Sequence, residues 1–154
     1  MFFNRKFLKE IDLAKKRGNI IHSDFKSFYI EMNKSNEEFL KDTYCKIILK
    51  IKSKKIGYTS LSVYQPGELF IDDLHIDDNH YENKGYGTEM LDTVKKIAEI
   101  NKFNRIVGDL SEKDMDHMEK LNYFYSKEGF TVTYYEKQEG INIGRIELFL
   151  PKNR

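Results

Sequence analysis

The sequence predicts a mixed α/β fold with a mostly antiparallel central sheet and helices on both faces. Two of the observations behind this prediction concern the spacing of apolar residues. They recur with period two between residues 44 and 76, and with helical spacing after Gly87. The third is the shortness of the connections between the period-two segments, which suits antiparallel strands. The predicted order is helices, meander, helix, strand, helix and hairpin, which is typical of one mixed sheet.

Length and composition predict a single domain over residues 1–154. The chain is 40% hydrophobic and 33% charged, as globular proteins are, and it contains no linker rich in proline, glycine or serine. Residues 1–43 form a divergent, helical N-terminal part. The formal charge of +1, from 26 basic and 25 acidic residues, argues against nucleic acid as a partner.

The chain also indicates its environment. Cys45 is the single cysteine, which excludes a disulfide framework and indicates a reducing compartment. Its strand-like surroundings favour a buried structural thiol over a catalytic one. No apolar run approaches the ~20 residues of a membrane span, and the charges within residues 1–6 do not suit a signal peptide. We therefore expect a cytoplasmic protein without a membrane segment.

The N-terminal region is predicted to be helical. Gly18 ends a first helix, whose apolar residues at helical spacing are Phe7, Leu8, Ile11 and Ala14. Residues 25–32 fit two structures, because their aromatic residues have helical spacing while residues 28–32 also alternate as a strand does. We favour a helix that begins after Ser23, a residue type common at N-caps.

Three strands follow. Apolar residues alternate mostly with lysines in the first, at Cys45, Ile47, Leu49 and Ile51. Residues 53–55 turn the chain into a second strand, residues 56–64. Gln65-Pro66-Gly67 is a turn that leads into a third strand, residues 69–76. The short turns predict an antiparallel meander.

The C-terminal half predicts alternating helices and strands. The helix after Gly87 has one apolar face, formed by Met90, Leu91, Val94, Ile97 and Ala98. A short strand over residues 105–110 precedes Ser111-Glu112-Lys113-Asp114, which has the spacing of a capping box that opens a helix. The remaining elements are the end of that helix at Gly129 and a hairpin, with strands 130–135 and 141–150 and a turn at 137–140.

The loop Lys84-Gly85-Tyr86-Gly87-Thr88 lies between the third strand and the long helix. A helix N-terminus presents unpaired N–H groups and the positive end of its dipole, and glycine lets the backbone approach an anion closely. Lys84 adds a positive charge and Thr88 a hydroxyl. The spacing fits neither a Walker loop nor the dinucleotide fingerprint. On spacing alone, a tight turn that needs glycine for its dihedral angles has about equal support.

Two motifs flank the long helix, one before it and one after it. Residues 82–87 match the pattern Gln/Arg-x-x-Gly-x-Gly/Ala at both glycines, and residues 125–130 match Tyr-x-x-x-Gly-Phe at the end of an aromatic-rich helix. The sequence thereby resembles the GNAT acetyltransferases over residues 74–130. Glu82 stands where the family has Gln or Arg, and Met118 and Leu121 replace the usual Asn and Ala of the helix.

The resemblance implies a sheet whose fourth and fifth strands, in the family's count, splay apart. Acetyl-CoA is the implied cosubstrate and lies along the fourth of these strands, which corresponds to residues 69–76 here. The residues implied to bind it are Leu74, His75 and Ile76 for pantetheine and Lys84, Gly85, Tyr86, Gly87 and Thr88 for the pyrophosphate. Tyr125 falls on the tyrosine that protonates the sulfur of CoA.

The general base is less certain than the acid. Asp72 and Asp73 lie on the strand beside the expected cofactor, and strict alternation places them on opposite faces. Glu68 lies near the start of that strand. His75 is another candidate, because histidine side chains commonly act as general bases, but the resemblance gives it a backbone role. Each of these residues also fits an ordinary strand surface. The other histidines lack metal-ligand spacing, so we predict no metal site.

The leading hypothesis is an N-acetyltransferase that transfers acetyl from acetyl-CoA to a primary amine of a small molecule or protein, with Tyr125 as general acid. One alternative is a non-catalytic acyl-CoA-binding regulatory module, consistent with Glu82 and Met118. Another is a toxin-like acetyltransferase of aminoacyl-tRNA, which the overall charge disfavours. The sequence does not identify the amine acceptor, and it leaves a homodimer open.

Overall fold

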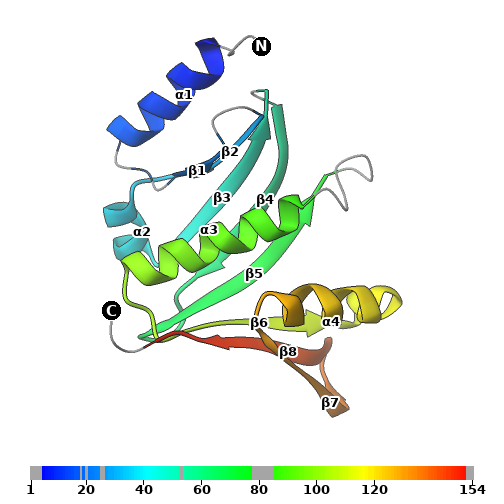
Figure 1. The fold of residues 1–154 in the computed structure, drawn as a ribbon. Helices are drawn as coiled ribbons and strands as arrows, with labels where there is room; N and C mark the ends of the chain where they lie inside the picture. Colours follow the sequence, from blue (N-terminus) through cyan, green and yellow to red (C-terminus); the bar gives the residue numbers. More distant parts are fainter. Residues whose placement is uncertain are drawn as a thin grey trace.

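The computed structural model describes residues 5–17, 19, 21–24, 27–52, 54–77 and 85–151. Within them, eight strands form one sheet (Figure 1). The elements are α1 (Arg5–Lys16), β1 (Ile21–Ser23), β2 (Phe28–Met32), α2 (Asn36–Asp42), β3 (Tyr44–Ile51), β4 (Lys54–Ser62), β5 (Glu68–Ile76), α3 (Tyr86–Ile100), β6 (Arg105–Ser111), the 3₁₀ helix η1 (Glu112–His117), α4 (Met118–Lys127), β7 (Thr131–Glu139) and β8 (Asn142–Phe149). No helix among the described residues is long and apolar enough to cross a membrane.

The sheet has the strand order β1-β2-β3-β4-β5-β6-β8-β7. Short turns join β3, β4 and β5 into the predicted antiparallel meander. β5 and β6 pair in parallel, and the other neighbouring strands pair antiparallel. A parallel pair needs a long crossover, which α3 supplies between β5 and β6. The predicted class, a mixed α/β fold with a mostly antiparallel sheet, is confirmed.

One predicted element is wrong, because the second half of the favoured N-terminal helix forms β2. Residues 25 and 26 lie outside the described residues. β2 pairs with β3 and buries Ile30 completely on one face. On its other face, Tyr29 is also buried and packs against Ile11 of α1. The strand is favoured because partners distant in sequence cover both of its faces, and such tertiary packing overrides local helical spacing.

A short helix that the sequence analysis did not identify, α2, connects β2 to β3. The Ser35 hydroxyl accepts a hydrogen bond from the Glu38 N–H, and the Glu38 carboxylate accepts one from the Ser35 N–H, each at 3.2 Å. Phe39 of this helix is fully buried, with its ring 6.4 Å from that of Phe103. The signal was a Ser-x-x-Glu capping box before an apolar residue.

Helices lie on both faces of the sheet. The predicted apolar face of α3 is confirmed: fully buried residues on it are Met90, Leu91, Val94, Ile97 and Ala98. They belong to the main core together with side chains from β2 to β6. Each fully buried valine, leucine, isoleucine or methionine side chain contributes about 1.5–3 kcal/mol, so α3 holds the sheet firmly. α1 packs on the opposite face through Ile11.

The C-terminal elements follow the predicted order. The capping box of Ser111 and Asp114 is present, but it opens the 3₁₀ helix η1, and α4 begins only at Met118. After α4, Gly129 adopts a left-handed φ of +92°, which glycine tolerates because it has no Cβ. β7 and β8 form the predicted hairpin, which turns at residues 140 and 141.

Candidate functional site

The parallel ladder between β5 and β6 is short. It runs from Glu68 opposite Arg105 to Ile71 opposite Gly108 and ends there. Both strands continue beyond the ladder, so their ends diverge (Figure 1). A pocket of about 420 Å³ lies at this divergence. The expected splay between two neighbouring strands is therefore found between β5 and β6.

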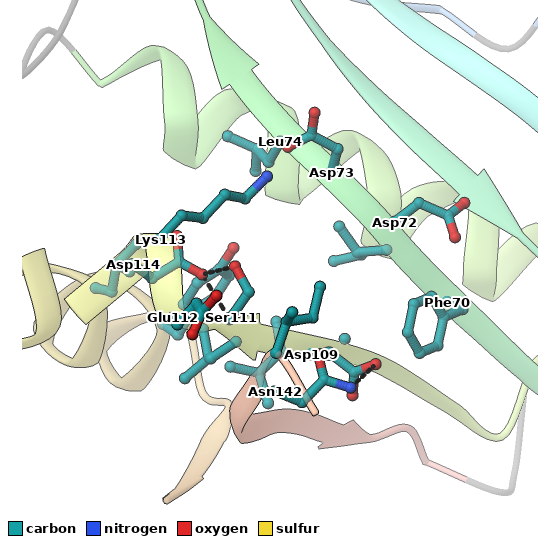
Figure 2. Close-up of a pocket in the computed structure, with 17 residues that line it drawn as sticks. Phe70, Asp72, Asp73, Leu74, Asp109, Ser111, Glu112, Lys113, Asp114 and Asn142 are labelled. Carbon is teal, nitrogen blue, oxygen red and sulfur yellow. Dashed lines mark hydrogen bonds between the residues drawn. The ribbon is translucent and has the colours of Figure 1, made fainter. Parts of the chain in front are cut away.

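The pocket brings together several of the residues predicted to act together. Tyr125, Asp72, Asp73 and Leu74 all line it. Figure 2 shows the two β5 carboxylates on one side of the pocket and residues 111–114 on the other. The remaining lining comes from β6, α4 and the hairpin of β7 and β8.

A β-bulge lies at Asp72. Asp73 pairs with Ser60 and Ile71 pairs with Leu61, so Asp72 has no partner on β4. The bulge comes directly after the last β5 residue that pairs with β6. It breaks the alternation from which we expected Asp72 and Asp73 on opposite faces. That expectation is wrong, since both carboxylates hydrogen-bond to a single row of side chains along β4 and the turn after it.

Neutral hydroxyl groups hold both carboxylates. Tyr58 donates to Asp73 Oδ2 at 3.0 Å, Tyr64 donates to Asp72 Oδ1 at 2.6 Å, and Ser62 also donates to Asp72. These hydrogen bonds raise the pKa of Tyr58 and Tyr64, because a carboxylate acceptor favours the protonated phenol. Within the described part of the chain, no cation pairs with either carboxylate. Both are oriented, and neither is neutralised.

Tyr125 of α4 lines the pocket although it is only 8% exposed. Phe124 and Phe130 pack edge-on to its ring, with centroid distances of 5.0 and 5.6 Å. Burial raises the pKa of the phenol to about 12, and the nearby carboxylates of Asp114 and Asp73 add to the rise. No hydrogen bond joins its hydroxyl to another described residue, so the phenol has a donor to offer to a molecule in the pocket.

Three β5 residues were expected to pair with the cofactor through their backbone, and one of them, Leu74, lines the pocket. The side chains of Leu74 and Ile76 pack against the main core. His75 is exposed, with its ring 5.6 Å from that of Tyr58 and Nε2 3.2 Å from a carboxylate oxygen of Asp77. Among the described residues, no strand pairs with the edge of this stretch that faces β6. Its backbone can therefore accept an added strand.

The glycine loop is described only in part: residues 85–88 lead into and open α3, whereas Lys84 lies outside the described residues. Gly85 is the N-cap, with a left-handed φ of +85° that favours glycine whether or not a ligand binds. A Cβ on Gly87 would lie 3.1 Å from the ring of Phe124, so α3 and α4 approach closely there. As the N-cap residue, Gly85 provides no side-chain hydrogen bond to the helix N-terminus.

Glu68 does not belong to the pocket. It is 4% exposed, and its Oε2 lies 2.6 Å from Arg105 Nη2 and 3.8 Å from Arg145 Nη2. Arg105 also pairs with Glu147 at 3.2 Å. The Arg105 contact lacks hydrogen-bond geometry, which leaves the buried Oε2 of Glu68 in an ion pair without a hydrogen bond. Glu68 is thus neutralised in the ladder, away from any acceptor.

Several charged residues of the pocket were not identified as site residues from the sequence: Asp109, Glu112, Lys113 and Asp114. The capping box drew attention to three of them, but as the start of a helix. Their position opposite β5 depends on how η1 follows β6, which no local pattern specifies. In the described ranges, no group of three or more His, Cys, Asp or Glu side chains is arranged to hold a metal ion. The absence of a metal site stays a prediction.

Comparison with known sequences places this site in a family. The model of the acetyltransferase (GNAT) family matches residues 18–130. A relative, the uncharacterized protein YocC of Bacillus subtilis (strain 168), is 30% identical over 92 residues, which are 57% of this chain and 53% of that protein. The match therefore spans about half the length of this relative.

Solved structures of low sequence identity share the fold. The PaiA N-acetyltransferase of Thermoplasma acidophilum, in complex with coenzyme A, has a TM-score of 0.58 at 17% identity, with 74% of this chain and 66% of that chain covered. A GNAT family acetyltransferase of Elizabethkingia anophelis with acetyl-CoA bound has a TM-score of 0.56 at 19% identity, covering 74% and 80%. With the family model matching most of its length, this chain belongs to the GNAT acetyltransferase family.

Proposed function

We propose that the protein is an acetyl-CoA-dependent N-acetyltransferase that transfers the acetyl group to a primary amine by direct attack. The observation that carries the proposal is Tyr125, a buried phenol that lines a pocket where two parallel strands diverge. Family membership supports the reaction type, and structural neighbours that hold coenzyme A or acetyl-CoA support the cosubstrate.

Acetyl-CoA lies along the unpaired edge of β5. Its pantetheine amides pair with the backbone of Leu74, His75 and Ile76 in the manner of an added strand. Its pyrophosphate lies at the N-terminus of α3, on the backbone N–H groups of residues 85–88 and near Lys84. The missing β6 partner along this edge and the uncapped start of α3 support this placement.

Two proton transfers accompany the reaction. The acceptor arrives as an ammonium ion, and Asp73 or Asp72 takes one proton from it, directly or through water. The neutral amine then forms the new N–C bond at the thioester carbon. When the tetrahedral intermediate collapses, the C–S bond breaks, and Tyr125 gives its proton to the departing thiolate. Tyr125 regains a proton from the amide nitrogen, so the products are the amide, the CoA thiol and one proton released to solvent.

The pKa of Tyr125 keeps the phenol protonated but makes it a weak acid. With a pKa of about 12, the phenol stays protonated throughout the neutral range. A thiolate whose conjugate acid has a pKa of ~8.5 takes that proton only at a cost of about 5 kcal/mol. Asp114 and Asp73 contribute to the raised pKa of Tyr125. A cation between these carboxylates and Tyr125 therefore lowers the cost.

Thiol release from acetyl-CoA, measured with a panel of primary amines, tests the proposed reaction. We expect release that depends on the amine, with the acetylated product identified by mass spectrometry. Calorimetry with CoA measures cofactor binding separately. A protein that binds CoA but releases no thiol with any amine would instead be a non-catalytic acyl-CoA-binding module.

The cofactor loop has a matched control within the chain. Gly85 and Gly140 both have positive φ, and a Cβ at either position would meet no atom within 4 Å. Gly85→Val and Gly140→Val therefore impose similar backbone strain. We expect Gly85→Val to weaken CoA binding at least tenfold, because the side chain keeps the pyrophosphate from the N–H groups. Equal CoA affinity in the two variants would contradict the placement.

A further inference from the structure

We infer that the amine acceptor is a small aliphatic diamine or polyamine, held by a second positive charge besides the amine that reacts. The inference rests on the proposed acetyl transfer and names the substrate class of the same pocket. It is carried by acidic residues on both sides of the pocket, by the apolar residues of its lining and by the hydroxyl of the buried Tyr125, which has no hydrogen-bond partner among the described residues.

Negative charge is concentrated in this pocket. Its charged lining consists of five carboxylates, from Asp72, Asp73, Asp109, Glu112 and Asp114, and one ammonium group, from Lys113 (Figure 2). The whole chain has a formal charge of +1, so the pocket does not simply repeat the composition of the protein. A ligand of the opposite sign is favoured here, because nearby charges interact more strongly in a partly enclosed site than in water.

The protein itself does not neutralise these carboxylates. Within the described part of the chain none of the five forms an ion pair, and neutral groups hold them in place. Across the pocket from β5 the donors are Gln138 to Glu112 at 2.9 Å, the Ser111 N–H to Asp114 at 2.8 Å and Asn142 to Asp109 at 3.5 Å. By contrast, the buried carboxylate of Glu68 is paired with arginine. A cationic ligand supplies the counter-charge that the pocket lacks.

Tyr125 independently indicates that a ligand completes the site. It is 8% exposed, lines the pocket, and its hydroxyl makes no hydrogen bond to a described residue. The charges of Asp114 and Asp73 help to raise the pKa of this phenol. An ammonium group bound beside them offsets that effect and makes Tyr125 a stronger acid. Binding of the cationic ligand and proton donation to the thiolate are thus coupled.

The size and apolar lining of the pocket fit a short methylene chain. Its volume of about 420 Å³ suits a small molecule. The apolar residues of the same lining include Phe70, Leu110, Leu121, Ile141 and Ile146. A diamine can place its two ammonium ends on the carboxylates and its methylene groups on these apolar residues. An amine on the surface of a folded protein enters such a pocket less readily.

Three acceptors of equal chain length test the inference: 1,4-diaminobutane, 1-aminobutane and 4-aminobutanoate. We expect kcat/KM to be at least tenfold higher for the diamine than for 1-aminobutane, since one charge-assisted contact changes affinity by about this factor. The acid should be poorest of the three. Added salt should narrow the difference between the diamine and 1-aminobutane, because it screens the pocket charges.

A double variant locates the effect. With Asp109→Asn and Glu112→Gln combined, we expect the preference for the diamine to fall below about threefold, mainly through a higher KM. Glu119→Gln is the matched control, because Glu119 is exposed on α4 and does not line the pocket. This control should keep the full preference. An unchanged preference in the double variant would overturn the assignment of the second charge to this wall.

The outcomes separate the inference from the proposed reaction. Equal kcat/KM for the diamine and 1-aminobutane, or faster acetylation of a lysine peptide than of the diamine, overturns the inference and leaves the acetyltransferase intact. Absence of thiol release with every amine overturns the proposed reaction. Calorimetry with 1,4-diaminobutane and 1-aminobutane still decides in that case, because the inference requires tighter binding of the diamine without turnover.

Discussion

The two halves of β5 lie in one strand but have opposite roles. Residues 68–71 pair with β6, Phe70 and Ile71 also pair with β4, and the carboxylate of Glu68 is buried in an ion pair with Arg105. Asp72 forms the bulge, and residues 73–76 pair with β4 and with no other described strand. Asp72 and Asp73 line a pocket, and their carboxylates have only hydroxyl partners among the described residues. The first half, residues 68–71, fixes the sheet, and we call it the closed half. The second half, residues 72–76, is available to a ligand, and we call it the open half.

The contrast shows that the role of a carboxylate depends on what lies across from it. Three carboxylates within six residues of one strand are equivalent candidates for a base by sequence. The structure neutralises one with arginine and leaves two with neutral donors. An ion-paired buried carboxylate is costly to disturb, whereas one held by hydroxyl groups can accept a proton without loss of a charge partner.

The largest expected effect concerns Tyr125, which faces the open half. Tyr125→Phe should lower kcat about a hundredfold or more, because it removes the proton donor while keeping the ring. CoA affinity should change little, as calorimetry would show. Tyr123→Phe is the matched control, since Tyr123 lies on the same helix and is 70% exposed. A similar loss of kcat in both variants would contradict the role of Tyr125.

The closed half should be the more sensitive to loss of charge. Glu68→Gln leaves Arg105 without its closest carboxylate, and we expect a loss of about 3 kcal/mol in the free energy of unfolding. Asp73→Asn keeps an acceptor for Tyr58 at a partly exposed position and should cost less than about 1 kcal/mol. Urea unfolding of both variants measures the difference. Equal losses would remove the distinction between the two halves.

Alkaline pH should weaken the protein through Tyr125. Its pKa is about 12 in the folded chain and near the ordinary value of 10 in the unfolded chain. Its contribution to stability is therefore complete below pH 10 and is lost as the pH rises from 10 towards 12, by about 1 kcal/mol at pH 11. The difference in unfolding free energy between the wild type and Tyr125→Phe, followed from pH 9 to 11, isolates this term. A constant difference would argue against a buried phenol.

The smallest expected effect concerns Cys45, whose thiol should not react with a thiol reagent in the folded protein. This thiol is fully buried on β3 opposite Leu61, which in turn pairs with Ile71 at the end of the closed half. Burial raises its pKa to about 12, so little thiolate forms at pH 8. A thiol reagent should label the chain in urea and leave the folded protein unlabelled. Rapid labelling of the folded protein would show that the core behind this half opens readily.

The elements with a single clear period were predicted well. β3 and α3 each have apolar residues at one spacing, and the structure buries most of those residues as expected. Residues 28–32 fit two periods, and pairing with β3 decided in favour of the strand. The capping box at Ser35 is a local signal, so α2 was predictable in principle.

The candidate site was predicted only in part. Tyr125 emerged from the resemblance, and Asp72 and Asp73 from their place on the strand beside the expected cofactor. Their shared access to the pocket depends on the bulge at Asp72, which is a mismatch in pairing with β4. Asp109 and Glu112 joined the site because β6 and η1 lie opposite β5.

The sequence by itself determined the periods of the main elements and the glycine and tyrosine motifs that mark the family, because these depend on dihedral preferences and on side chains close in the chain. Only the tertiary structure decided where the ladder between β5 and β6 ends, and which carboxylate is neutralised. The physical reason is that strand pairing and ion pairing balance burial, hydrogen bonding and charge among residues far apart in sequence. The two halves of β5 therefore differ in role although they follow one another directly in the chain.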